Sequence, residues 1–186
     1  MKRRVLAALC LSILFTLLLS SCNSKTDNTG NTVPETATNR ASFNTDDFEI
    51  NIYSDKAVYK STEAIKIRAT LEYIGSSDTV TIWHGEPYII FSITDGKDFN
   101  IYGNVLTIMA RTDLEKGTLY HFDYQKSGGW NASAPDAAYW ESFFEEKDLI
   151  LPAGEYTVSV MGAFSLTDKV IGSESGLICD LKITVE

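Results

Sequence analysis

The two histidines are the first residues to consider for chemistry, because imidazole acts as a metal ligand and as a general base near neutral pH. His84 and His121 are the only histidines among the 186 residues, which excludes a zinc site of three histidines. No motif of a serine hydrolase, a zinc protease, a phosphate-binding loop or a metal-binding cysteine pair accompanies them. His84 precedes a turn at residues 85–87 and is expected in a loop. His121 is expected on the solvent face of a strand, so the sequence predicts a protein that is not an enzyme and has no cofactor.

Two groups of acidic residues offer oxygen ligands for a calcium ion. The first is Asp95-Gly96-Lys97-Asp98, and the second lies between Glu141 and Asp148. Neither has the ligand spacing of an EF-hand loop. We therefore interpret the first group as a hairpin turn and the second as a solvated surface, and we predict no metal site.

Aromatic residues are the stronger candidates for a binding site. They are concentrated in residues 126–147, a long connection of the kind that carries binding surfaces on rigid sandwiches. An alternative is that those spaced by three and four residues close the open end of the core. Trp130 follows two glycines and is expected to be exposed; with Trp83 it can stack on a sugar ring or anchor a protein partner. The predicted ligand-binding residues are Trp130, Trp83, Tyr139 and Trp140.

The elements that hold these residues are predicted to be strands, because apolar and polar residues alternate along most of the chain after residue 47. Turn residues such as Asp95-Gly96 separate the strands, and only residues 137–148 predict a helix. Seven to nine strands at this spacing predict an all-β, antiparallel, immunoglobulin-like two-sheet sandwich. The nine predicted strands are 48–53, 65–73, 79–83, 88–93, 99–102, 105–110, 118–124, 156–164 and 177–185.

Residues 151–158, Leu-Pro-Ala-Gly-Glu-Tyr-Thr-Val, resemble the tyrosine corner of immunoglobulin-like sandwiches. The resemblance implies that the Tyr156 hydroxyl donates a hydrogen bond back to the preceding backbone. The order of segments 59–71, 90–96, 114–118 and 151–158 is also similar to that of BsuPI-like intracellular proteinase inhibitor domains. That likeness implies a protease as partner, and residues 127–147 are an insertion in its layout.

The N-terminus has the features of an export signal. Three basic residues at positions 2–4 precede an apolar run, Val5 to Leu19, that is shorter than a bilayer span requires. The run ends in Leu19-Ser20-Ser21-Cys22, which resembles the bacterial lipobox. The resemblance implies cleavage before Cys22 and lipid attachment to its thiol, which places the domain outside the cytoplasm in a bacterial cell envelope. The alternatives are an uncleaved anchor helix and a conventional signal with an incidental cysteine.

Cysteine usage and charge restrict the rest of the molecule. Cys10 leaves with the signal and Cys22 carries the lipid, so Cys179 remains alone and is expected in the core. The net charge is −9; without residues 1–21, which contain three basic and no acidic residues, 13 basic and 25 acidic residues leave −12. Such an acidic domain repels nucleic acid and anionic membrane surfaces, so nucleic acid is not an expected partner.

The sequence predicts three parts. Residues 1–21 are the signal peptide, residues 22–46 the lipidated cysteine and a disordered polar tether, and residues 47–186 the sandwich domain. The expected function is that of a membrane-anchored, non-enzymatic binding protein with a protein partner. The alternative is a carbohydrate-binding module that uses its tryptophans on envelope polysaccharide.

Overall fold

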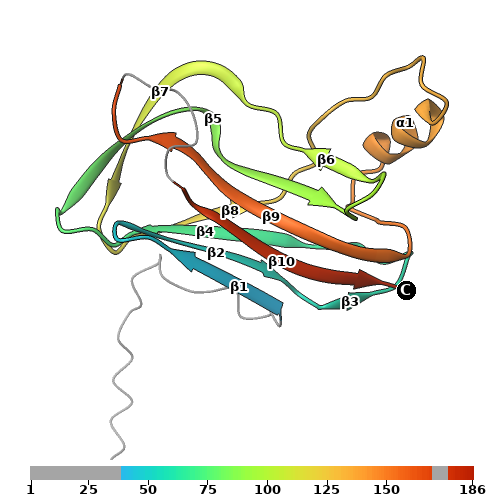
Figure 1. The fold of residues 1–186 in the computed structure, drawn as a ribbon, viewed down its shortest axis with the longest axis horizontal. Helices are drawn as coiled ribbons and strands as arrows, with labels where there is room; N and C mark the ends of the chain where they lie inside the picture. The colour runs from blue at the N-terminus through green and yellow to red at the C-terminus, as the bar shows by residue number, and fades with distance from the viewer. Residues whose placement is uncertain (1–38, 169–175) are drawn as a thin grey trace, which may run out of the picture.

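A computed structural model describes residues 39–168 and 176–186, which form two sheets packed face to face (Figure 1). The first sheet has the order β1-β2-β4-β8, and the second has the order β3-β10-β9-β5-β6, with β7 also paired to β5. All strand pairs are antiparallel except β3 with β10. The predicted all-β, two-sheet sandwich is confirmed.

The described residues form ten strands and one helix. They are β1 (Asn39–Asn44), β2 (Phe48–Ser54), β3 (Val58–Tyr59), β4 (Ile67–Tyr73), β5 (Thr79–Thr94), β6 (Asn100–Tyr102), β7 (Leu106–Glu115), β8 (Leu119–Asp123), α1 (Ala137–Glu145), β9 (Gly154–Ser165) and β10 (Ile178–Val185).

The core is built by the alternation that the sequence predicted. Ile50 and Leu71 of the first sheet and Val158 and Phe164 of the second are inaccessible to solvent. Aromatic rings join the two sheets directly, because the Phe48 and Phe164 rings are 5.1 Å apart in an edge-to-face arrangement. Cys179 is 4% exposed, and burial raises the pKa of its thiol. Its predicted place in the core is therefore confirmed.

The predicted tether is wrong for residues 39–44. β1 occupies this range and pairs with β2 over its full length, from Asn39 opposite Ser54 to Asn44 opposite Glu49. Polar residues are tolerated in β1 because most of its side chains face solvent. Backbone hydrogen bonds to β2 hold the strand in place. The described domain thus begins at residue 39, while the signal peptide, Cys22 and tether residues 23–38 lie outside the described residues.

β5 is one strand of 16 residues where the sequence predicts two strands and a turn at residues 85–87. Its register against β9 shifts between His84 and Ile89, where residues 85–88 of β5 lie opposite the single residue 163 of β9, so the predicted turn is a bulge inside the strand. Only glycine fits at position 85, because an added Cβ would lie 2.5 Å from Val105 Cγ1 and 2.7 Å from the Leu106 carbonyl oxygen. Beyond the bulge, β5 pairs with β6 through the predicted Asp95-Gly96 hairpin, where Gly96 has φ of 74°.

The tyrosine corner is confirmed. The Tyr156 hydroxyl donates a hydrogen bond of 2.9 Å to the Pro152 carbonyl oxygen, and burial raises its pKa to about 12. Tyr124 is different, because its buried hydroxyl has no hydrogen-bond partner among the described residues, and burial again raises its pKa to about 12. Two tyrosines thus share a desolvated environment but differ in hydrogen bonding.

We expect Tyr156→Phe to lower the free energy of unfolding by about 1 kcal/mol, since it removes a hydrogen bond and leaves the Pro152 carbonyl unsatisfied. Tyr124→Phe should leave the free energy unchanged or raise it, because it removes a desolvated hydroxyl without a partner. Urea unfolding followed by tryptophan fluorescence measures both. An equal decrease in the free energy of unfolding in the two variants would contradict the conclusion that only the Tyr156 hydroxyl has a hydrogen-bond partner.

Candidate functional site

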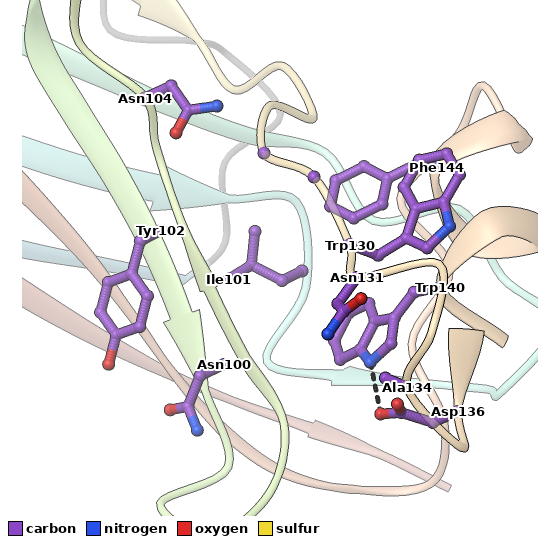
Figure 2. Close-up of a pocket in the computed structure, with 12 residues that line it drawn as sticks. Asn100, Ile101, Tyr102, Asn104, Trp130, Asn131, Ala134, Asp136, Trp140 and Phe144 are labelled. Carbon is purple, nitrogen blue, oxygen red and sulfur yellow. Dashed lines mark hydrogen bonds between the residues drawn. The ribbon is translucent and has the colours of Figure 1, made fainter.

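A groove of about 450 Å³ lies between β6 and the segment that carries α1 (Figure 2). Figure 1 places β6 and α1 together at one end of the sandwich, with the helix outside both sheets. The groove has two kinds of side chain in its wall. The aromatic ones are Tyr102, Trp130, Trp140 and Phe144, and the amides and the carboxylate are Asn100, Asn104, Asn131 and Asp136.

The helix is held on the sandwich by aromatic contacts below the groove. Phe143 is 7% exposed, and its ring lies 5.8 Å from that of Phe99, which is 5.4 Å from Trp140. Lys126 Nζ donates a hydrogen bond of 2.7 Å to the Phe143 carbonyl oxygen, and desolvation lowers the pKa of this lysine. The inner side of α1 therefore closes the core, which is the alternative that the aromatic spacing indicated.

The outer part of the same segment forms a surface. The Trp130 side chain is 41% exposed and stacks on Phe144, with ring centroids 5.7 Å apart and planes 14° apart. Trp140 is fixed by its indole Nε1, which donates a hydrogen bond of 2.7 Å to Asp136 Oδ2 (Figure 2). The two tryptophans thus line one groove in defined orientations.

Some polar atoms of the groove wall are already used within the protein. Asn100 accepts a hydrogen bond from the Thr94 hydroxyl and donates one to the Lys97 carbonyl. Asn131 Oδ1 accepts a hydrogen bond of 2.9 Å from the Ser133 amide. Within the described residues this leaves the Asn104 amide, Asn131 Nδ2 and Asp136 Oδ1 available to a ligand. No lysine or arginine is among the residues that line the groove.

Trp83 and Tyr139 are not part of this groove. Trp83 lies on the other half of β5, half-buried, with the Arg111 guanidinium 6.0 Å from its ring. It precedes Ser92, where β6 begins to pair, by nine positions, a span of up to about 30 Å at 3.3 Å per residue. Tyr139 is 42% exposed and lines a separate hollow beside Pro152. Trp83 and Trp130 therefore cannot form one binding platform.

His84 is not a loop residue. It is 3% exposed within β5, and Nδ1 donates a hydrogen bond of 2.6 Å to the Gly85 carbonyl oxygen. Nε2 forms a hydrogen bond of 2.8 Å with the Thr112 hydroxyl, so both ring nitrogens bind the protein itself. The prediction failed because the Gly-Glu-Pro sequence forms a bulge instead of a turn. His121 is exposed on β8, as predicted.

Neither a metal site nor a membrane-spanning helix is found in residues 39–168 and 176–186. No three His, Cys, Asp or Glu side chains there are grouped to hold a metal ion. No helix in the same residues has the length and apolar character needed to cross a bilayer.

The first half of β7 is a second candidate surface, one not predicted from the sequence. Leu106, Ile108 and Met109 are 66%, 47% and 56% exposed, although all three are apolar. Among the described strands β7 pairs only with β5, so none of them covers its other edge. The signal was present in the sequence, because apolar residues at both odd and even positions of residues 105–109 cannot all face the core.

Comparisons with known proteins give only distant structural likenesses. No protein-family model and no curated protein matches the sequence. One similar solved structure is the β-glucosidase EmGH1 of Erythrobacter marinus, with 13% identity, a TM-score of 0.36, and coverage of 75% of this chain and 15% of the glucosidase. Another is the sporulation control protein Spo0M of Bacillus subtilis, with 12% identity, a TM-score of 0.34, and coverage of 75% and 49%. The chain thus spans less than half of either protein.

Proposed function

We propose that this protein is a lipid-anchored, non-enzymatic binding protein of the bacterial cell envelope, and that it binds a protein partner through the open edge of β7. The observation that carries the proposal is the exposure of Leu106, Ile108 and Met109 on that edge. Exposed apolar groups gathered in one place on a soluble domain mark an interaction surface.

The edge has the properties that strand addition requires. An open edge presents unpaired N–H and C=O groups, and a partner strand can bind them while its side chains meet those of the edge. Proteins usually protect such edges with charges, prolines or short strands. β7 has ten residues, and the charged ones, Arg111, Asp113 and Glu115, all lie in its second half. The first half carries no charge and no proline, and its residues 107–109 form a bulge opposite Gly85 of β5.

The expected anchor supports this function. A lipid on Cys22 would hold the domain at a membrane surface outside the cytoplasm, where partner strands from other envelope proteins are accessible. The similarity to BsuPI-like inhibitor domains makes a protease one class of partner. The interacting surface would then lie on β7, instead of on residues 126–147.

Site-specific photocrosslinking in living cells tests the proposal. A photoreactive phenylalanine analogue at Ile108 should give a discrete adduct with one identifiable protein, whereas the same analogue at Phe43, on the exposed β1, should not. Met109→Arg should abolish the Ile108 adduct, because it places a charge on the apolar edge. As a matched control, Leu166→Arg changes an apolar residue that is 48% exposed on another segment and should leave the adduct unchanged.

Identical adducts from positions 108 and 43, or no adduct from position 108, would overturn the protein-binding function. A urea unfolding curve for each arginine variant separates lost binding from lost folding.

A further inference from the structure

We propose that the groove of Trp130 and Trp140 binds an uncharged sugar ring of an envelope glycan, at a site separate from the β7 edge. Its volume of about 450 Å³ lies in the range of small-ligand sites. A groove of this size takes a few ring-sized groups, whereas a protein partner needs a broad surface. The proposal does not depend on the protein-binding function of β7.

The aromatic wall is organised before a ligand arrives. Trp130 is 41% exposed, but its ring is held in one orientation because it stacks on Phe144. The loop that carries Trp130 lies close to the helix at Gly128, where an added Cβ would be 3.0 Å from Phe144 Cζ and where φ is 139°. A fixed indole presents an apolar surface to the C–H groups of a sugar ring at little cost in side-chain entropy.

The polar wall fits hydroxyl groups. Asn131 Nδ2 is a donor and Asp136 Oδ1 is an acceptor, and each is held in place because the other atom of its own side-chain group is bound internally. The Asn104 amide adds both a donor and an acceptor, since no hydrogen bond occupies it within the described residues. A sugar hydroxyl both donates and accepts, so adjacent hydroxyls match this arrangement.

The charge of the groove determines which class of sugar can bind. Asp136 is the only Asp, Glu, His, Lys or Arg among the residues that line the groove, so no cationic side chain is there to balance an anionic ligand. The whole chain has a net charge of −9. Uronic acids, sulfated sugars and phosphates would therefore be repelled, whereas an uncharged hexose or N-acetylhexosamine would not.

Isothermal titration of the purified full chain with three trisaccharides tests the inference. Cellotriose and chitotriose are the uncharged probes, and trigalacturonate is the anionic one. At least one uncharged probe should bind, and trigalacturonate should bind at least about tenfold more weakly. Trp130→Ala should weaken binding of the uncharged probe by about tenfold or more, because it removes the exposed aromatic anchor.

Matched variants exclude a general structural effect. Trp83→Ala removes a tryptophan that does not line the groove and should leave the affinity unchanged. Asn131→Ala should also weaken binding, since it removes the Nδ2 donor. This variant replaces Trp130→Ala in the test if Trp130→Ala fails to fold. Asp136→Asn keeps an oxygen for the Trp140 indole and should bring the affinity for trigalacturonate closer to that for the uncharged probe.

The inference is overturned if neither uncharged probe binds, if trigalacturonate binds as well as they do, or if Trp83→Ala weakens binding as much as Trp130→Ala. Binding of an apolar peptide in place of both sugars would likewise assign the groove to another ligand class. The Ile108 crosslink should still form in the Trp130→Ala protein. The sugar-binding role of the groove and the protein-binding role of β7 are thus tested independently.

Discussion

Replacing Cys22 by alanine should abolish lipid attachment completely. In cells grown with radioactive palmitate, the wild-type protein should be labelled and should fractionate with membranes, whereas the Cys22→Ala protein should carry no label. It should also retain residues 1–21, visible by mass spectrometry, because the Leu-Ser-Ser-Cys sequence that the peptidase is expected to require is destroyed. Each acyl methylene that enters the bilayer contributes about 0.8 kcal/mol, so two or three chains anchor a protein essentially permanently.

Cys179→Ala is the matched control for the same experiment. Cys179 is 4% exposed and burial raises the pKa of its thiol, so it is neither accessible nor activated for acylation. Its replacement should leave the label and the fractionation unchanged. A wild-type protein that stays on membranes without any acyl label would favour the uncleaved anchor helix and refute the lipoprotein assignment.

Phe99→Ala should destabilise the domain by about 3–5 kcal/mol. Phe99 is 8% exposed and contacts three other rings, those of Trp140, Phe143 and Tyr156, at centroid distances of 5.4, 5.8 and 5.4 Å. Its removal leaves a cavity between α1 and the sandwich and loosens the tyrosine corner. Such a loss is a large part of the roughly 5–15 kcal/mol that stabilises an ordinary domain.

Urea unfolding followed by tryptophan fluorescence measures this loss, and Phe43→Ala is the control. Phe43 is the same residue type but is 42% exposed on β1, so its truncation removes less buried surface and should cost below about 1 kcal/mol. Phe99→Ala should also weaken sugar binding, because Trp140 loses its support. Similar costs for the two variants would mean that α1 does not pack on the core in solution.

The local pattern of apolar and polar residues was sufficient to predict most strands. Apolar side chains two residues apart, as in Ile50 and Ile52, specify which face of a strand is buried, and this holds wherever the strand pairs. The Asp95-Gly96 hairpin, the Tyr156 corner and a helix from Ala137 were predictable for the same reason, since each depends on neighbours within a few residues. The burial of Cys179 was predictable because it lies at an apolar position of such an alternation.

Three features depended on partners far along the chain. β1 is polar and would not fold alone, and it forms because β2 offers an edge. Gly85-Glu86-Pro87 has the composition of a turn, but pairing of β5 with β7 and β9 on either side makes it a bulge and buries His84. The exposure of Leu106 follows from the lack of a further strand beside β7 among the described residues.

The candidate site shows the same division. The aromatic residues of the 126–147 segment predicted a binding region, and Trp130 and Trp140 of this segment line one groove. Trp83 does not, because residue type carries no information about which half of a long strand lies beside the helix. Alternation and turn chemistry are local properties and can be read along one chain. Strand order, open edges and the walls of a groove arise from contacts between distant segments, and only the folded chain brings those segments together.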